Sequence, residues 1–385
     1  WEVGLPTGKA TRLTDLNTWK DKIYSILTVQ ITKVNKIQQM PFIAHKKSKD
    51  SIRYTNTPPD KPIIIDSITL EDYINFHDIE YTVMDGVYWD EGRNRKMGEV
   101  IQTLFNSRMK YKKTNVALAN TIKLMLNSAY GKTIMKKSKY KKQIVRTVRR
   151  RYNKSTKKWI TESDTNINDY VYNNFNTIRS YRKLNEHNYE VESTTADNTY
   201  NRGHIGCAVL SMSKRIMNEV FNVANDNNYP IYYTDTDSLH CNLEDVPKII
   251  TKYGERYNRE LDGNQLGQFN TDFDLEGAAT EIYATKSVFL GKKSYMDYLE
   301  STDEKGNTVH GFHIRLKGIT KEGLEHTAKQ YDNSYIGLYE DLAKGNEKKI
   351  ILNPYNPDTN ENKVLFEFKE GKVSTRKEFT RVVKF

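Results

Sequence analysis

The sequence is poor in cysteine and in long apolar runs. Cys207 and Cys241 are the only cysteines among 385 residues, which excludes a disulfide framework and a zinc site built on four thiolates. No run approaches 18 consecutive apolar residues and the mean hydropathy is −0.77, which excludes a protein that crosses a membrane through apolar helices. The first residue is Trp1, and no charged and then apolar leader follows it. The low cysteine content fits a reducing compartment.

Positive charge is in modest excess and is unevenly distributed. Lysine and arginine number 60 against 49 aspartates and glutamates, a net charge of +11. Residues 132–158 contain 13 lysines or arginines and no acidic residue. Such a density of cations favours a polyanionic partner, although a solvated basic hairpin would have the same composition. Aromatic residues make up 11% of the chain, enough to build cores, and the length predicts two or three domains.

The hydrophobic periodicity predicts a mixed α+β chain. Strands are expected at residues 23–32, 61–66, 313–316 and 364–368. Helices are expected over most of residues 98–135 and at residues 204–225 and 246–257. Residues 143–148 and 158–161 are expected to pair as a basic hairpin, and residues 162–200 are interpreted as connection.

The helix expected from about Val116 has two different faces. Apolar side chains share one face at helical spacing: Leu118, Ile122, Met125 and Ala129. Polar side chains share the other face: Lys123, Asn127 and Tyr130. We expect the first face to be packed and the second to point outward. This arrangement is more specific than a single stray basic residue.

A pair of carboxylates lies between two apolar, strand-like runs. The stretch Tyr-Tyr-Thr-Asp-Thr-Asp-Ser at residues 232–238 predicts a hairpin with Asp235 and Asp237 at its tip. Two carboxylates this close are costly unless something pairs with them, and hard divalent cations such as Mg²⁺ suit their oxygen atoms. The alternative is an Asx turn, in which Asp235 only caps its own backbone.

Three motifs, in the correct order, resemble those of the family B DNA polymerases. Residues 233–238 (Tyr-Thr-Asp-Thr-Asp-Ser) are similar to the third palm motif of that family. Residues 123–131 (Lys-Leu-Met-Leu-Asn-Ser-Ala-Tyr-Gly) are similar to its fingers-helix motif, and residues 293–295 (Lys-Ser-Tyr) to its Lys-x-Tyr element. The resemblance implies an α+β polymerase right hand with an antiparallel-sheet palm, helical fingers, β-rich insertions and a small thumb, and with the exonuclease domain outside this chain.

The spacing of these motifs is most similar to that of the protein-primed branch of the family. Residues 66–112 and 132–200 stand where that branch carries two insertions, the second being a hairpin associated with strand displacement and processivity. The implied division is palm at 1–66, first insertion and fingers at 67–135, second insertion at 136–200, palm with the catalytic hairpin at 201–280, and thumb at 281–385. The resemblance implies that a terminal protein serves as the primer and that a virus, phage or linear mobile element encodes the chain. It also implies a location in the cytoplasm or nucleus of the host cell.

The resemblance also implies roles for individual residues in the transfer of dNTPs to a primer on a DNA template, with two Mg²⁺ ions or Mn²⁺ in their place. Asp237 would be the shared metal ligand, with Asp235 in or near the coordination shell. The implied nucleotide-binding residues are Arg108, Lys112, Lys123, Asn127 and Tyr130, with Lys110 and Lys113 as alternatives to the first two. The implied DNA-binding residues are Gly131, Tyr233, Lys293 and Tyr295.

The carboxylate of the family's first palm motif is not found in the sequence. Asp66 does not fit this role, because it is not followed by the Tyr-Pro of that motif and lies too close to Lys123. We interpret Asp66 as a strand end before a capped helix. Residues 5–8 (Leu-Pro-Thr-Gly) resemble the segment just after the motif. We therefore expect an upstream segment or a second chain to supply the first carboxylate and the exonuclease.

Three origins stay open for this missing carboxylate: a portion of a longer polymerase, a split enzyme, and a retired polymerase that only binds nucleic acid. The alternative function is accordingly a non-catalytic DNA-binding replication clamp or scaffold. A clamp would bind DNA without Mg²⁺, whereas nucleotide addition requires the ion. An RNA-templated polymerase shares the palm chemistry, but the Asn-Ser-x-Tyr-Gly pattern favours DNA.

Overall fold

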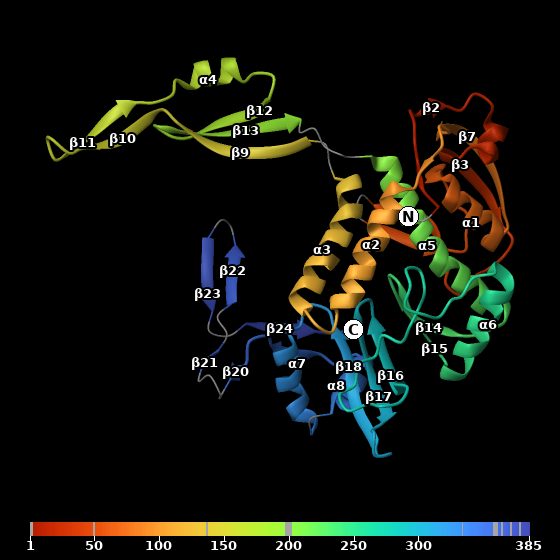
Figure 1. The fold of residues 1–385 in the computed structure, drawn as a ribbon. Helices are drawn as coiled ribbons and strands as arrows, with labels where there is room; N and C mark the ends of the chain where they lie inside the picture. Colours follow the sequence, from red (N-terminus) through yellow and green to blue (C-terminus); the bar gives the residue numbers. More distant parts are fainter. Residues whose placement is uncertain are drawn as a thin grey trace. The chain divides into compact units, whose positions relative to one another are not determined.

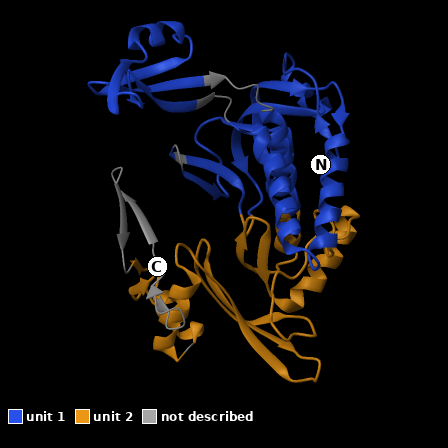
Figure 2. Cartoon of the chain, turned by 60° about the vertical axis from the view of Figure 1, so that its left-hand side comes forward, with its two compact units in different colours: residues 1–37, 41–216 blue, residues 38–40, 217–385 orange. Residues whose placement is uncertain are grey.

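The computed structural model describes residues 3–48, 51–135, 138–196, 202–332, 334–356, 361–362, 365–369, 372–376 and 379–385. Figure 1 shows the helices and strands of the chain. The chain forms two compact units, which Figure 2 shows in different colours: residues 1–37 and 41–216 make the first, and residues 38–40 and 217–385 the second. Both units combine helices with antiparallel strands, which confirms the predicted mixture of the two.

A four-stranded antiparallel sheet forms the core of the first unit. Its order is β2 (Thr11–Arg12), β7 (Ile79–Trp89), β3 (Tyr24–Val34) and β6 (Ile63–Asp66). Between Ser25 and Ile31 of β3 every second side chain is buried, including Leu27 and Val29. They pack against Leu70 and Tyr73 of helix α1 (Ser67–His77). The alternation that predicted the strand is therefore the pattern of one buried sheet face.

Asp66 ends strand β6, as expected from the sequence, and it is itself the residue that caps helix α1. Its Oδ1 accepts the backbone N–H of Thr69 at 2.9 Å, and its Oδ2 accepts the hydroxyl of Tyr24 at 3.0 Å. The side chain is buried, and both of its oxygens are used inside the fold. Asp66 is thus a structural residue.

Helices α2 (Lys96–Tyr111) and α3 (Val116–Thr133) pack against each other. The predicted packed face of α3 is partly wrong. Ala119 and Ile122 are buried, whereas Leu118 is 37% and Met125 53% exposed. A helix that packs on one neighbour buries only a narrow stripe, so apolar residues beside that stripe stay in water.

Residues 138–196 form a lobe that contains two small sheets. Strands β12 (Ile178–Asn185), β13 (Asn188–Ala196) and β9 (Ser138–Arg146) make a three-stranded antiparallel sheet in that order. Strands β10 (Val148–Asn153) and β11 (Lys158–Ser163) pair separately as a hairpin, and helix α4 spans Ile167–Asn173.

Two expectations about this lobe are wrong. The strand that contains residues 158–161 pairs with residues 148–153 instead of residues 143–148. Residues 162–200 were expected to be connection, yet their described part contains α4, β12 and β13. Strands β12 and β13 consist mainly of charged, polar and tyrosine side chains, so hydrophobic periodicity does not mark them.

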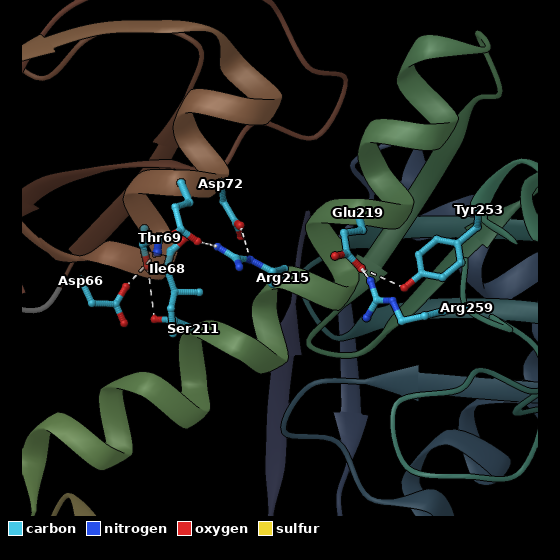
Figure 3. A network of polar contacts seen from close by, with 10 residues as sticks. Asp66, Ile68, Thr69, Asp72, Ser211, Arg215, Glu219, Tyr253 and Arg259 are labelled. Atoms are coloured by element: carbon cyan, nitrogen blue, oxygen red, sulfur yellow. Dashed lines mark hydrogen bonds and ion pairs between the residues drawn. The ribbon is translucent and has the colours of Figure 1, made fainter. Parts of the chain in front are cut away.

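Helix α5 (Gly203–Asp226) is anchored by ion pairs within each unit, as Figure 3 shows. In the first unit, the Arg215 guanidinium donates to the carboxylate of Asp72, which is almost fully buried. In the second unit, the carboxylate of Glu219 pairs with the guanidinium of Arg259 and also accepts the hydroxyl of Tyr253 at 2.8 Å. Buried charges are tolerated only when they are paired in this way.

The second unit is built around a three-stranded antiparallel sheet, β16 (Tyr283–Gly291), β17 (Ser294–Thr302) and β18 (Thr308–Leu316). Met296 and Leu316 of this sheet pack with Leu338 and Leu342 of helix α8 (Tyr335–Ala343). Helix α6 (Val246–Tyr257) and the hairpin of β14 (Ile231–Asp235) and β15 (Ser238–Cys241) precede the sheet in the chain.

The remaining elements are short. In the first unit they are β1 (Leu5–Pro6), the 3-10 helix η1 (Leu16–Asp21), β4 (Ile43–Ser48), β5 (Ser51–Thr55) and β8 (Arg93–Asn94). In the second unit they are η2 (Leu243–Asp245), α7 (Lys321–Ala328), η3 (Lys329–Tyr331), β19 (Lys348–Ile351), β20 (Tyr355–Asn356), β21 (Glu361–Asn362), β22 (Leu365–Lys369), β23 (Lys372–Arg376) and β24 (Thr380–Val383). Among the described residues, no helix combines the length and the apolar content that a bilayer crossing requires.

The other predicted elements are confirmed with small shifts. Helices α5 and α6 cover the predicted helices at 204–225 and 246–257, and β18 contains the predicted strand at 313–316. Strand β22 covers residues 365–368 of the strand predicted at 364–368, and residue 364 lies outside the described residues.

Candidate active site

The hairpin β14–β15 places the predicted carboxylate pair at a tight turn. Asp235 pairs with Ser238 across the two strands, so Thr236 and Asp237 form the connection. The N–H of Asp237 donates to the carbonyl of Asp235 at 2.7 Å. Thr236 has a φ of +60°, which is unusual for a β-branched residue. Strained backbone of this kind is concentrated at functional sites.

Asp235 is paired with a lysine from the turn between β16 and β17. The Nζ atom of Lys293 lies 2.8 Å from each carboxylate oxygen of Asp235. This contact lowers the pKa of the Asp235 carboxyl and raises the pKa of the Lys293 ammonium. The backbone N–H of Lys293 also donates to the hydroxyl of Tyr233 at 2.9 Å. Two of the motifs found in the sequence therefore meet in the fold.

Asp237, in contrast, is not paired with any described side chain. Its side chain is exposed, and its carboxylate has no hydrogen bond or ion pair within the described part of the chain. One carboxylate of the pair is thus compensated by an ammonium group, and the other is free to meet a cation from outside.

An aromatic cluster packs around Tyr233 and so supports the hairpin that carries the turn. The ring of Tyr233 stacks on Phe289 with centroids 5.2 Å apart and an interplanar angle of 10°. It also contacts Tyr295 at 4.9 Å and His240 at 5.5 Å. Tyr295 is 7% exposed, and its burial raises the pKa of its hydroxyl to about 12. Tyr295, which is predicted to bind DNA, therefore also packs against the ring of Tyr233.

Beside this cluster lies a buried carboxylate that the sequence analysis missed. Asp297 is fully buried, and its oxygens lie 3.2 Å from Nε2 of His240, 3.3 Å from Nδ1 of His313 and 2.6 Å from Oγ of Ser287. Burial alone would raise the pKa of Asp297, but these hydrogen bonds outweigh it and lower the pKa to about 2. No motif marks Asp297; the one available signal was an acidic residue two positions after Tyr295 in an apolar strand.

The predicted nucleotide-binding residues lie on the first unit, on or next to α2 and α3. Arg108 and Tyr130 are half-buried, whereas Lys112, Lys123 and Asn127 are exposed. The outward position predicted for this face of α3 is therefore confirmed for Lys123 and Asn127, whereas Tyr130 is only partly exposed. A Cβ added at Gly131 would meet no atom of the chain within 4 Å, so no packing inside the described structure requires glycine there.

An open hollow of roughly 600 Å³ adjoins the turn that carries the carboxylates. Its lining includes Met40, Tyr233, Asp235, Gly291, Lys292 and Lys293. The hollow therefore exposes the compensated carboxylate and two lysines to solvent, next to the free carboxylate of Asp237. This mixture of charges can hold both a cation and a phosphate oxygen.

The comparisons with known proteins agree with this arrangement. The family model described as DNA polymerase type B, organellar and viral, matches residues 3–253. No curated protein matches the chain. Two crystal structures of phi29 DNA polymerase match with a TM-score of 0.55 each: a ternary complex with primer-template DNA and incoming nucleotide substrates at 15% identity, and an orthorhombic crystal form at 14%.

The two structural matches cover 99% and 100% of this chain but only 55% and 56% of the phi29 polymerase chain. The chain therefore spans about half the length of those structures. At this level of identity the structural likeness concerns the fold, whereas the family model covers well over half of the sequence. Together they confirm the resemblance drawn from the three motifs. The chain belongs to the organellar and viral type B DNA polymerases.

Proposed function

We propose that this chain is the polymerising portion of a DNA-directed DNA polymerase, which adds dNTPs to a primer by two-metal nucleotidyl transfer. The observation that carries the proposal is the state of the turn between β14 and β15. Asp235 is held by Lys293 at 2.8 Å, while the neighbouring carboxylate of Asp237 is exposed and unpaired within the described residues. A merely structural Asx turn would need neither the second carboxylate nor the lysine.

The donor set fits a hard divalent cation. Asp237 offers free carboxylate oxygens, which Mg²⁺ prefers and Mn²⁺ also accepts. In the described residues no group of three histidine, cysteine, aspartate or glutamate side chains is placed to hold a metal ion, so substrate oxygens, water or a further carboxylate would complete the shell. Such ions supply activation of the primer hydroxyl and neutralisation of the triphosphate charge.

The protein groups around the turn have distinct roles in this proposal. Lys293 compensates Asp235 in this structure and can turn toward a primer phosphate when DNA binds. Tyr233 is held by stacking and by the N–H of Lys293, which makes it a rigid support for the primer terminus. In the first unit, Lys123 meets the triphosphate as a point charge, with Arg108 and Lys112 as further cations.

The remaining assignments follow from the branch of the family. Asn127 and Tyr130 shape the pocket of the nascent base pair, and the open space at Gly131 admits DNA. Tyr295 holds the primer strand together with Lys293. The same proposal includes priming by a terminal protein and an upstream segment that supplies the first carboxylate. It also includes strand displacement by residues 132–200 and the five-part division into palm, fingers, insertions and thumb.

Primer extension tests the proposal directly. The assay uses a primed DNA template, dNTPs and Mg²⁺, with the chain alone and with the segment expected to supply the first carboxylate. Asp237→Asn should lower incorporation by at least about a hundredfold, as expected for loss of an electrostatic group at the reacting centre. Asp332→Asn, which removes an exposed carboxylate far along the sequence, is the matched control and should leave incorporation unchanged.

Binding of Mn²⁺, followed by electron paramagnetic resonance, gives a second readout that needs no turnover. It should weaken in Asp237→Asn and stay unchanged in Asp332→Asn. If DNA binds equally well with and without Mg²⁺, and no mixture extends the primer, the proposal fails and the non-catalytic clamp replaces it.

A further inference from the structure

The hairpin β10–β11 is almost entirely exposed to water. All six residues of β11 are exposed, and so are four of the six in β10. Its turn is nevertheless well defined, because Oδ1 of Asn153 accepts the backbone N–H groups of Ser155 and Thr156 at 2.9 and 3.2 Å. The hairpin is a structured element most of whose side chains are exposed, and Figure 1 shows its two paired strands at one end of the lobe.

The cations of this lobe fall into two groups. On the three-stranded sheet, Arg182 and Lys142 contact Glu190 and Arg179 contacts Glu192. Three further cations of that sheet have no ion pair within the described residues: Lys141, Arg146 and Lys183. The cations of the hairpin have no ion pair within the described residues: Arg149, Arg150, Arg151, Lys154, Lys157 and Lys158. Most of the uncompensated positive charge among the described side chains of the lobe therefore lies on the hairpin, and such a concentration of cations favours a polyanionic partner.

An aromatic pair occupies one face of the same hairpin. Tyr152 and Trp159 lie directly opposite each other, with ring centroids 5.4 Å apart in an edge-on arrangement. Trp159 is 69% exposed, whereas Trp19 and Trp89 are buried. The alternation of strands places Arg150 on the face that carries the two rings. A large aromatic surface left in water, next to unpaired cations, indicates a binding surface.

We infer that the β10–β11 hairpin binds single-stranded DNA, with bases stacked on Trp159 and Tyr152 and phosphates contacted by the unpaired arginines and lysines. Flat aromatic surface is used by single strands, whose base faces are free, and is of no use to a duplex, whose bases are already stacked. Lysine and arginine supply the affinity that does not depend on sequence. The inference rests on the proposed function for its DNA partner but concerns a surface separate from the carboxylate turn.

Fluorescence anisotropy tests this inference, using the whole chain, labelled oligothymidine and a labelled duplex of equal length, without Mg²⁺ or dNTPs. Trp159→Ala should weaken binding to oligothymidine between about fivefold and about a hundredfold, and Trp159→Phe should restore most of it. Tyr172→Ala is the matched control, because Tyr172 is 83% exposed on α4 of the same lobe and should have no effect.

The charges are tested by salt dependence. Replacing Arg149, Arg150 and Arg151 together by alanine should reduce the slope of log affinity against log salt by about 2 units, since each contact to a single strand contributes about 0.7. Arg182→Ala, which removes a cation already paired with Glu190, should change the slope much less. Trp159→Ala should leave the slope unchanged.

Two results would overturn the inference: equal affinity of Trp159→Ala and the parent for oligothymidine, or an equal loss of affinity for the duplex. The assay involves no turnover, so it is independent of the polymerase proposal. Binding that depends on Trp159, in a protein that never extends a primer, would refute only the latter.

Discussion

Two of the antiparallel hairpins in the described structure, β14–β15 and β10–β11, are of similar size but differ in their surroundings. The hairpin β14–β15 contributes Tyr233 and His240 to an aromatic cluster with Phe289 and Tyr295. The hairpin β10–β11 has no such support, and Trp159 is 69% exposed. An isolated two-stranded hairpin is marginally stable in water. The first hairpin can hold reacting groups at fixed positions because its neighbours hold it, whereas the second can only offer charge and aromatic surface.

The same contrast holds for the charges. At the first hairpin, Asp235 is compensated by Lys293, and the buried Asp297 is compensated by hydrogen bonds from His240 and His313. At the second hairpin the cations are left without an ionic partner in the described residues. Compensation fixes a side chain in one place, which suits catalysis. Uncompensated charge suits a flexible polyanion.

The largest expected difference between the hairpins concerns Asp297. Asp297→Ala leaves His240 and His313 without the buried acceptor that they share, and should lower the free energy of local opening of β14–β18 by about 3 kcal/mol. Glu162→Ala on β11 removes an exposed carboxylate and should change the opening of its own hairpin by less than about 0.5 kcal/mol. Hydrogen–deuterium exchange of the two segments measures both; equal effects would show that the support under the first hairpin is unimportant.

Acid should destabilise the folded state by protonating the carboxylate of Asp297. The pKa of Asp297 is about 2 in the fold, below the value of about 3.9 of an unperturbed aspartate. A depressed pKa stabilises the folded state above the unfolded value, and that contribution is lost as the pH falls from about 4 to about 2. The stability lost should be about 2 kcal/mol.

This loss is measured by urea unfolding of the second unit, followed by tyrosine fluorescence at pH 5 and at pH 2.5. Asp297→Asn should be less stable than the parent at pH 5, and the gap should narrow at pH 2.5. A gap that stays constant would mean that Asp297 is not the titrating group.

The smallest expected effect comes from removing the hydroxyl of Tyr233. Tyr233→Phe removes the acceptor for the N–H of Lys293 and should increase exchange at that amide by an amount equivalent to about 1 kcal/mol. Tyr152→Phe is its counterpart on the bare hairpin and should leave exchange there unchanged. Protection of the Lys293 amide in Tyr233→Phe would show that the turn between β16 and β17 is held by other contacts.

Local patterns predicted much of the fold. The helix of residues 246–257 was predicted at its true bounds, and Asp235 and Asp237 were placed at the tip of a hairpin, because a short polar turn between two apolar runs is a local property. The pairing of β11 with β10, and the sheet of β9, β12 and β13, were not predicted. Their strands carry charged and polar side chains, so their sequence resembles that of a loop.

The candidate site shows the same division. The motifs were sufficient to identify the polymerase family and to name Tyr233, Asp235, Asp237 and Lys293, because each motif is a short run of consecutive residues. That Lys293 pairs with Asp235, 58 residues away, and leaves Asp237 free is a property of the packed structure alone. So is the burial of Asp297 between two imidazoles. Ion pairs and burial depend on which distant segments meet, and hydrophobic periodicity carries no information about that.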